Sequence, residues 1–310
     1  MRAVAIDDFG AAPALRDLPK PEPGPGEVLV RIRASSINGF DLAVAGGMLK
    51  GMMEHRFPVV LGKDFAGTVE ALGEGVTRFA VGDQVFGVVM KPELGDGAFG
   101  EYVAVGEGFG ITHIPAGLDI ASAGALGLAG TAGLMSVNAV DPAAGETVLV
   151  CGATGGVGAH VVQVAAARGA EVVATARSGE EADLVRGLGA AHTVDYTGDV
   201  PAAVRSVRSD GVHAVVHLAG DGLQLAELLV DGGRIASTLG LGPDQLADRD
   251  VTATAVMATP DAATLDRLAA DVAAGRLRVP ITRTYQLAEV PKALADFAGG
   301  TLGKLAVIID

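Results

Sequence analysis

The sequence predicts an α/β fold in which a doubly wound parallel sheet is joined to a β-rich part. Three observations lead to this prediction. Short apolar strands and helices alternate from about residue 147 to residue 256. A strand, a glycine-rich turn and a helix follow one another within residues 147–168. The first third of the chain has short alternating strands separated by Gly and Asp pairs. At 310 residues the chain is long for one domain and suits two.

The first third is expected to form a barrel-like or partly open antiparallel sheet. In the segment 27–35, Val28, Val30 and Ile32 alternate with Leu29, Arg31 and Arg33. A Pro/Gly-rich turn at 19–26 precedes this strand. The predicted strands of this part are 2–6, 27–35, 67–72, 83–89 and 99–105.

From residue 119 the pattern changes to helices and then to strand–helix pairs. Two helices are predicted at 119–127 and 129–140. Strands are predicted at 147–151, 171–175, 192–195, 212–218, 233–238 and 251–256, with helices at 156–168, 179–188, 200–207 and 223–230 between them. Such an order is typical of a parallel sheet with right-handed crossovers.

The last fifty residues return to the character of the first third. Here we expect helices at 261–274 and 289–298 and strands at 282–287 and 304–309. The predicted domains are therefore 1–118 with 262–310, and 119–261.

The turn at 152–158 is the strongest local indication of a binding site. The strand 147–151 leads into Gly152-Ala-Thr154-Gly155-Gly156-Val157-Gly158, and a helix follows. Glycine accepts positive φ and allows a close approach to the backbone, and a helix that starts here directs free N–H groups at the turn. This geometry fits a pyrophosphate. A purely structural turn is the alternative, because the spacing is G-x-x-G-x-x-G and the chain has 45 glycines. The strand–helix pairs that follow favour the nucleotide site.

Composition and charge narrow the classes of partner. The net charge of −14 argues against a nucleic acid or an anionic membrane as partner. The single cysteine, Cys151, is expected to be a small core residue. No apolar stretch of transmembrane length is free of charge or glycine, and the first residues do not resemble a signal peptide, so a cytoplasmic location is expected.

Several motifs together carry a resemblance to a known family. They are, in chain order, Asn38-Gly-Phe-Asp41, Gly62-Lys63-Asp64-Phe-Ala-Gly67-Thr-Val69, Val81-Gly82-Asp83-Gln-Val85, Thr131-Ala132, the glycine turn and Gly303-Lys304. The chain resembles the medium-chain dehydrogenase/reductase superfamily, and within it the zinc-free quinone oxidoreductases. The resemblance implies a GroES-like catalytic domain built from both chain ends, an inserted Rossmann nucleotide-binding domain, and a cofactor between them.

Two competing families do not fit the sequence. Short-chain dehydrogenases use a Tyr-x-x-x-Lys pair, but the residues four after Tyr102, Tyr196 and Tyr285 are Gly106, Val200 and Glu289. The zinc branch of the resembled superfamily often has a His where this chain has Lys63, and no second cysteine is present for a structural zinc. We therefore expect no bound metal. The six histidines are scattered, and His217 is expected to be a satisfied core residue.

Without zinc, the more natural reaction is hydride donation to an acceptor that is already electrophilic. Asn38, Asp41 and Lys63 are the predicted catalytic residues, with His55 as a further candidate to orient or polarise the substrate. Lys63 is equally consistent with an ordinary surface or ion-paired lysine. The tyrosine that related quinone oxidoreductases often carry after this segment is missing from residues 42–56.

These features predict an NADPH-dependent reductase of a quinone or of the activated C=C of an α,β-unsaturated carbonyl. Two alternatives remain open. One is a trans-acting enoyl reductase that works on a thioester. The other is a non-catalytic NADPH-binding sensor protein.

We predict a preference for NADPH over NADH, because no carboxylate ends the strand 171–175. Thr175, Arg177 and Ser178 stand there instead, and a guanidinium suits a 2′-phosphate. The resemblance adds Tyr196 to this site, whereas an exposed Arg177 and a packing Tyr196 are the alternative. The complete predicted cofactor set is Asn38, Thr131, Gly152, Thr154, Gly155, Gly156, Val157, Gly158, Thr175, Arg177, Ser178, Tyr196, Leu218, Ala219 and Gly220.

A homodimer is also predicted. Residues 250–257 alternate polar and apolar side chains and should form the last strand of the parallel sheet. An uncovered edge strand tends to pair with another, and the resemblance implies pairing across a two-fold axis. An edge covered by the chain's own helix is the alternative.

Overall fold

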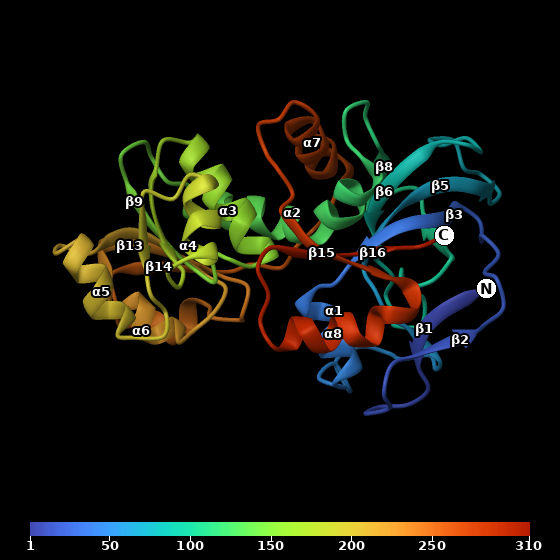
Figure 1. Cartoon of the computed structure of the whole chain (residues 1–310), viewed down its shortest axis with the longest axis horizontal. Helices are drawn as coiled ribbons and strands as arrows, with labels where there is room; N and C mark the ends of the chain where they lie inside the picture. The colour runs from blue at the N-terminus through green and yellow to red at the C-terminus, as the bar shows by residue number, and fades with distance from the viewer. The chain divides into compact units, whose positions relative to one another are not determined.

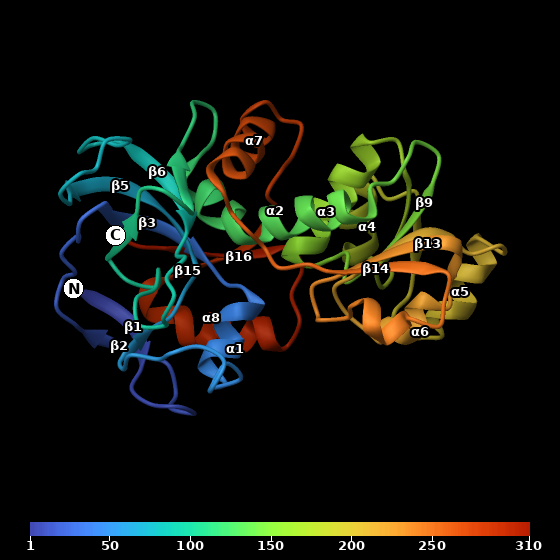
Figure 2. The same ribbon diagram turned by 180° about the vertical axis from the view of Figure 1, so that it is seen from behind.

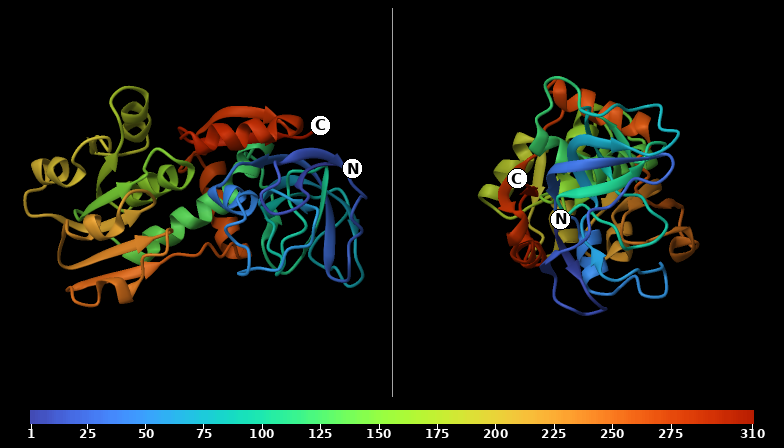
Figure 3. Two further views of the ribbon diagram at one scale, coloured as in Figure 1. Left: turned by 90° about the horizontal axis from the view of Figure 1, so that it is seen from below. Right: turned by 90° about the vertical axis from the view of Figure 1, so that its right-hand side faces the viewer.

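The computed structural model describes all 310 residues, which divide into two compact units. The terminal unit contains Met1–Thr131 and Thr259–Asp310, and the central unit contains Ala132–Ala258. Both ends of the chain belong to the terminal unit (Figure 3). The sequence prediction placed the boundaries at 118/119 and 261/262, whereas the first division in the structure falls inside helix α2 (Ile120–Val140).

The terminal unit is built on two sheets, which are mostly antiparallel. The larger has the strand order β15-β16-β3-β5-β6-β8, with β7 also paired to β3, and the smaller has the order β2-β1-β4. The first strands are β1 (Arg2–Ile6), β2 (Ala14–Asp17), β3 (Glu27–Ser36), β4 (Val59–Val60), β5 (Asp64–Leu72), β6 (Gln84–Val88), β7 (Tyr102–Gly106) and β8 (Ile111–His113). The tail adds α7 (Ala262–Ala273), β15 (Ile281–Gln286), α8 (Val290–Ala298) and β16 (Lys304–Ile308).

Strand β3 is central because its side chains supply the core of the larger sheet. Val28, Val30 and Ile32 are buried in one apolar cluster, whereas Arg31 and Arg33 are exposed. Strand β16 pairs antiparallel with β3, so the tail lies beside the first third of the chain (Figure 1). The same cluster takes in the apolar side chains of β16 and α8.

The central unit is a six-stranded parallel sheet with the order β11-β10-β9-β12-β13-β14. Its strands are β9 (Thr147–Cys151), β10 (Glu171–Thr175), β11 (His192–Val194), β12 (Val212–His217), β13 (Leu229–Ser237) and β14 (Val251–Ala255). The helices between them are α3 (Gly156–Ala167), α4 (Glu180–Gly187), α5 (Val200–Val207) and α6 (Gly222–Ala226). The strand order reverses between β9 and β12, and ligands of doubly wound sheets bind at such a point. The edge strand β14 lies beside β13 (Figure 2).

Helix α2 corrects the sequence prediction of two helices separated near Leu128. One helix runs through this position, and its glycines let Ala34 and Val88 of the terminal unit come close. A Cβ on Gly124 would stand 2.7 Å from the carbonyl carbon of Ala34, and one on Gly127 would stand 2.9 Å from Val88 Cγ2. By length and composition α2 could cross a membrane, but 72% of its most apolar 18-residue stretch is buried inside the structure, as in a core helix.

Helix α6 is shorter than the predicted helix at 223–230, because the chain turns into the sheet sooner. The carbonyl of Leu228 accepts a hydrogen bond of 2.8 Å from the N–H of Val212, and β13 begins at Leu229. The prediction also missed the short elements β2, β4, β8 and α1 (Gly39–Ala45). These elements are brief, and β4 and β8 pair with strands that are not their neighbours in the sequence, β1 and β6.

Candidate functional site

The glycine turn of the central unit links β9 to α3. Gly152 has φ +83°, a backbone conformation that residues with a side chain rarely adopt. A Cβ on Gly158 would stand 2.2 Å from the carbonyl oxygen of Gly152, so the helix packs against the turn only because this residue is glycine. No side chain caps α3 at its N-cap residue, Gly155. The first N–H groups of the helix can therefore donate to an anionic group, which fits the predicted pyrophosphate.

A pocket of about 460 Å³ lies beside this turn, at the carboxyl ends of the central strands. Six predicted cofactor residues line it: Gly152, Thr154, Thr175, Tyr196, Ala219 and Gly220. Cys151, Gly198, Asp199, Val200, Pro201, Asp221, Gln224 and Leu225 complete the lining and were not predicted. A site of this size, at this edge of a doubly wound sheet, suits a mononucleotide half of a dinucleotide.

The other predicted cofactor residues lie outside this lining. Gly155, Gly156, Val157 and Gly158 form the cap and first turn of α3. Leu218 directly follows β12, and Arg177 and Ser178 are exposed just beyond β10. Asn38 and Thr131 belong to the terminal unit, where the Thr131 hydroxyl is buried without a hydrogen-bond partner.

The hydroxyl of Thr175 stabilises the glycine turn through two hydrogen bonds. It accepts a hydrogen bond of 2.9 Å from the N–H of Gly152 and donates one of 3.3 Å to the carbonyl of Val150. Thr175 is also buried. Its hydrogen-bonding capacity is therefore directed to the backbone of β9 and the turn, and Arg177 and Ser178 remain the exposed polar groups at this strand end.

Glu181 is a residue of this region that the sequence reasoning missed. Its carboxylate lies 2.6 Å from Nη2 of Arg177, accepts the backbone N–H of Arg177 at 2.8 Å, and accepts the hydroxyl of Tyr196 at 3.1 Å. The Arg177 guanidinium also lies 5.8 Å from the centroid of the Tyr196 ring. The prediction considered only the end of β10, whereas Glu181 comes from α4. The i,i+4 spacing from Arg177 was the available signal.

Arg177 and Glu181 each stabilise the charged form of the other. Burial acts to raise the pKa of Glu181, but the hydrogen bonds from Arg177 and Tyr196 outweigh it, and the pKa is lowered. Glu181 in turn raises the pKa of Arg177 through the same hydrogen bond. Arg177 is thus held charged and in place, but with one carboxylate already beside it.

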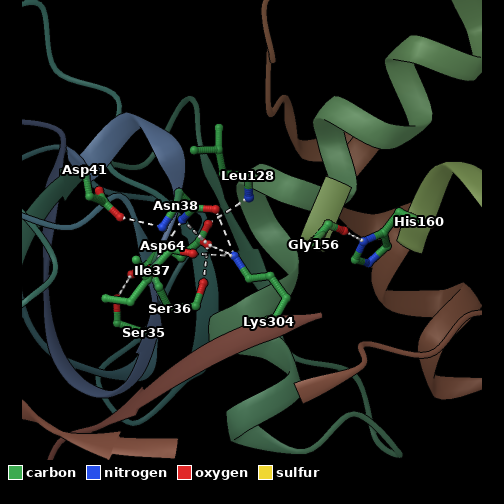
Figure 4. A network of polar contacts seen from close by, with 10 residues as sticks. All are labelled: Ser35, Ser36, Ile37, Asn38, Asp41, Asp64, Leu128, Gly156, His160 and Lys304. Carbon is green, nitrogen blue, oxygen red and sulfur yellow. Dashed lines mark hydrogen bonds and ion pairs between the residues drawn. The ribbon is translucent and has the colours of Figure 1, made fainter. Parts of the chain in front are cut away.

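The terminal unit holds a buried polar network centred on Asp64 (Figure 4). One carboxylate oxygen accepts the backbone N–H of Leu128 at 2.7 Å. The other accepts the hydroxyl of Ser36 at 2.6 Å and the amide of Asn38 at 2.8 Å, and lies 3.5 Å from Lys304 Nζ. Asp64 is 0% exposed and Lys304 is 2% exposed, so the opposite charges balance each other inside the core.

The side chain of Asn38 is fully used within this network. Its Oδ1 accepts a hydrogen bond of 2.8 Å from Lys304, and its Nδ2 donates to Asp64. The residue is 7% exposed. The geometry therefore assigns the carboxamide to holding the network together, rather than to an open position where it could polarise a substrate.

Asp41 and Lys63, the other two predicted catalytic residues, line one small cavity together with Phe40. One carboxylate oxygen of Asp41 accepts the N–H of Asn38 at 2.8 Å, and the other is buried without a partner. Burial and the nearby Asp64 raise the pKa of Asp41 to about 7. Burial lowers the pKa of Lys63, whose ammonium lies 4.9 Å from the centroid of the Phe40 ring.

The histidines do not gather into a site. His217 is buried and its ring nitrogens lie 3.0 Å from Ser237 Oγ and 3.0 Å from the carbonyl of Gly220, as expected for a core histidine. His55 lies 2.8 Å from the carbonyl of Met53 and packs against Phe9. No three His, Cys, Asp or Glu side chains lie close enough together to hold a metal ion.

Comparison with known proteins identifies the family. Residues 24–116 match the alcohol dehydrogenase GroES-like domain, and residues 188–307 match a model described as zinc-binding dehydrogenase. The chain is 34% identical over 228 residues to the chloroplastic quinone-oxidoreductase QR1 of Triphysaria versicolor, covering 71% of this chain and 68% of that protein. The chain belongs to the medium-chain dehydrogenase/reductase superfamily, in its quinone oxidoreductase-like branch.

Solved structures of this superfamily agree with that placement. The quinone oxidoreductase from Coxiella burnetii has a TM-score of 0.91 and 28% identity, covering 100% of this chain and 99% of that one. A mycobacterial protein complexed with NADPH has a TM-score of 0.86 and 27% identity, covering 99% of both chains. The predicted fold class, a GroES-like part and a Rossmann sheet, is confirmed. The protein is an NAD(P)-dependent oxidoreductase of a small-molecule substrate.

One relative is much longer than this protein. A mycocerosic acid synthase-like polyketide synthase of Mycolicibacterium smegmatis is 35% identical over 288 residues. That match covers 90% of this chain but only 13% of the synthase.

Proposed function

We propose that the protein reduces a quinone, or the activated C=C of an α,β-unsaturated carbonyl, with NADPH and without zinc. The observation that carries the cofactor assignment is the pocket of about 460 Å³ beside an uncapped glycine turn. The kinship with quinone oxidoreductase QR1 supports the acceptor class.

The central unit binds the cofactor through its backbone and through two side chains. The N–H groups at the start of α3 hold the pyrophosphate. Arg177 and Tyr196 meet the 2′-phosphate at the end of β10, where a guanidinium can form two parallel hydrogen bonds. The structural relative complexed with NADPH supports this choice of cofactor. When bound, the cofactor supplies the hydride.

The absence of zinc is supported by the ligands that the chain offers. Lys63 is a poor zinc ligand at neutral pH, and the only cysteine, Cys151, is buried in the other unit beside the glycine turn. Purified protein prepared without chelators should therefore contain less than stoichiometric zinc by elemental analysis. One zinc per chain would overturn this part of the proposal.

An enoyl reductase that acts on a thioester is the second candidate. The similarity to a polyketide synthase over 90% of this chain favours it. A non-catalytic NADPH-binding sensor is the third alternative, because no tyrosine acid is present in residues 42–56.

A single screen separates these candidates. NADPH consumption is followed with benzoquinones and naphthoquinones, short enones and enoyl thioesters, alongside simple alcohols with NADP⁺. Turnover of quinones or free enones supports the first function, and turnover of thioesters alone supports the second. Tight NADPH binding without turnover supports the sensor. Efficient oxidation of alcohols with no reduction of any acceptor would place the protein in a different branch.

A further inference from the structure

An acidic and a basic side chain, Asp41 and Lys63, line the same cavity in the terminal unit. Asp41 on α1 is 1% exposed, and its Oδ1 has no hydrogen-bond partner. Lys63, just before β5, is partly exposed and forms no hydrogen bond or ion pair through its ammonium, which lies over Phe40. Both residues line a cavity of 10 Å³, which is about the size of one water molecule.

The surroundings of this cavity leave Lys63 as the available acid. The buried lysine of this region, Lys304, already donates to Asn38 and to the carbonyl of Ile37. Asp96 also lines the cavity, but it is bound by Lys91 at 2.7 Å. An ammonium that is partly exposed and unbound can give up a proton, whereas one held by a carboxylate cannot do so easily.

We propose that Lys63 is the proton donor of the reduction, and that Asp41 supplies Lys63 with the next proton through the shared cavity. This inference rests on the proposed function for its substrate, an α,β-unsaturated carbonyl. Lys63 is the catalytic residue, and Asp41 is a positioning and relay residue that does not contact substrate.

The proton balance closes within the reaction. Hydride addition to the β-carbon breaks the C=C π bond, and its electron pair moves onto the α-carbon and carbonyl oxygen as an enolate. Lys63 gives one proton to the α-carbon, forming the second C–H bond, and becomes a neutral amine. Asp41 then gives its proton to Lys63 and becomes a carboxylate, which solvent reprotonates. The acceptor is reduced, the nicotinamide is oxidised, and one proton is consumed.

The electrostatics of the pair suit this transfer. Burial moves the pKa of Asp41 up and that of Lys63 down, which brings the two proton affinities together. The charged groups that face the pair are Asp64 from β5 and Lys304 from β16, and Asp96 lies at the cavity wall. A proton passes most readily between groups whose pKa values are close.

The first test uses the product's stereochemistry. An enone with an α-methyl group is reduced in D₂O by wild type, Lys63→Met, Lys63→Arg and Asp41→Asn, with the exposed Lys292→Met as matched control. Wild type and the control should deuterate one face of the α-carbon. Lys63→Met should lower the enone kcat by about 10²–10⁴-fold and yield both faces, because bulk water then supplies the proton.

Lys63→Arg and a quinone acceptor test whether the effect comes from the acidity of Lys63. Lys63→Arg keeps the charge but is too weak an acid, so it should behave like Lys63→Met. Quinone reduction needs no proton on carbon, so the Lys63 variants should keep it within about tenfold. Unchanged kcat and facial selectivity in both Lys63 variants, with enone turnover intact in wild type, would overturn the proposal.

The second test does not depend on turnover. Lysines are reductively methylated with ¹³C-formaldehyde, and the Lys63 resonance is identified by its loss in Lys63→Arg. It should titrate below the exposed lysines, and further below in Asp41→Asn, because the Asp41 charge acts to raise the pKa of Lys63. A Lys63 resonance that titrates like exposed lysines and ignores Asp41→Asn would refute the relay, even if no enone substrate is found.

Discussion

Lys304 Nζ lies 2.8 Å from Oδ1 of Asn38, although 266 positions separate the two residues in the sequence. The hydrogen bond joins β16, near the end of the chain, to the residue that caps α1. It also fixes which way the carboxamide points, because Oδ1 faces the ammonium while Nδ2 faces Asp64. The C-terminal strand thereby orders the segment that leads to Asp41.

Replacement of Lys304 should destabilise the fold strongly. Lys304→Met leaves Asp64 charged and buried without its counter-ion, which should lower the free energy of unfolding by roughly 3–5 kcal/mol. Urea unfolding followed by circular dichroism measures the change. The exposed Lys292→Met should stay within about 0.5 kcal/mol of wild type. A loss below about 1 kcal/mol for Lys304→Met would show that the buried pair contributes little.

Asp41 should make stability depend on pH. Its pKa is raised from 3.8 to about 7, so between these values the folded state holds a proton that the unfolded state releases. Its stabilising contribution is complete below pH 3.8 and is lost as the pH rises through about 7. Asp41→Asn should remove this dependence, which is at most about 1.4 kcal/mol per pH unit. Urea unfolding of both proteins from pH 4 to 8 measures it, and parallel curves would contradict the assignment.

Arg177→Ala should weaken NADPH binding by roughly 1.5–3 kcal/mol, because a hydrogen bond to a charged phosphate is lost. NADH lacks this phosphate, and its affinity should change little. Isothermal titration with both cofactors gives the two values. The exposed Arg205→Ala, on α5, serves as a control for general loss of positive charge. Equal losses for both cofactors, or a wild-type preference for NADH, would show that Arg177 does not bind the phosphate.

Glu181→Gln should raise the preference for NADPH over NADH. The amide oxygen can still accept hydrogen bonds from the Arg177 guanidinium and the Tyr196 hydroxyl, and the neutral side chain no longer repels a 2′-phosphate beside them. The amide nitrogen replaces the oxygen that accepts the Arg177 backbone N–H, so that one hydrogen bond is lost. The expected gain in NADPH binding is at most about 1 kcal/mol, or roughly fivefold, as is usual for partly exposed charges. The readout is the dissociation constant of NADH divided by that of NADPH, which should rise. A fall in this ratio would mean that the carboxylate is required to position Arg177.

The edge of the parallel sheet should form a homodimer contact. Strand β14 pairs only with β13, and Met257 just beyond it is 83% exposed. A lysine at the exposed Ala255 should block strand pairing and shift the protein to monomer. Ala263→Lys, on the exposed face of α7, is the matched control. Light scattering at micromolar concentration measures the mass. Wild type that is monomeric throughout would rule out the dimer.

Local pattern in the sequence was enough for most of the secondary structure. The strand Thr147–Cys151, the glycine turn and α3 follow from features within about twenty residues: β-branched apolar residues, glycines and helical spacing. The same holds for β1 and β10, whose bounds match the prediction. Alternation and helix spacing depend on near neighbours, so they can be recognised without the fold.

Only the tertiary structure decided how the polar side chains are used. Asn38 appeared free to contact a substrate, but its amide is bound by Lys304 and Asp64 from two distant strands. The sequence at the end of β10 has no carboxylate, but α4 places Glu181 against Arg177. Gly124 of α2 likewise lies against the backbone of Ala34, a residue 90 positions earlier in the chain. A hydrogen bond or a close backbone contact depends on positions in space, and segments far apart in the chain reach those positions only when the sheets assemble.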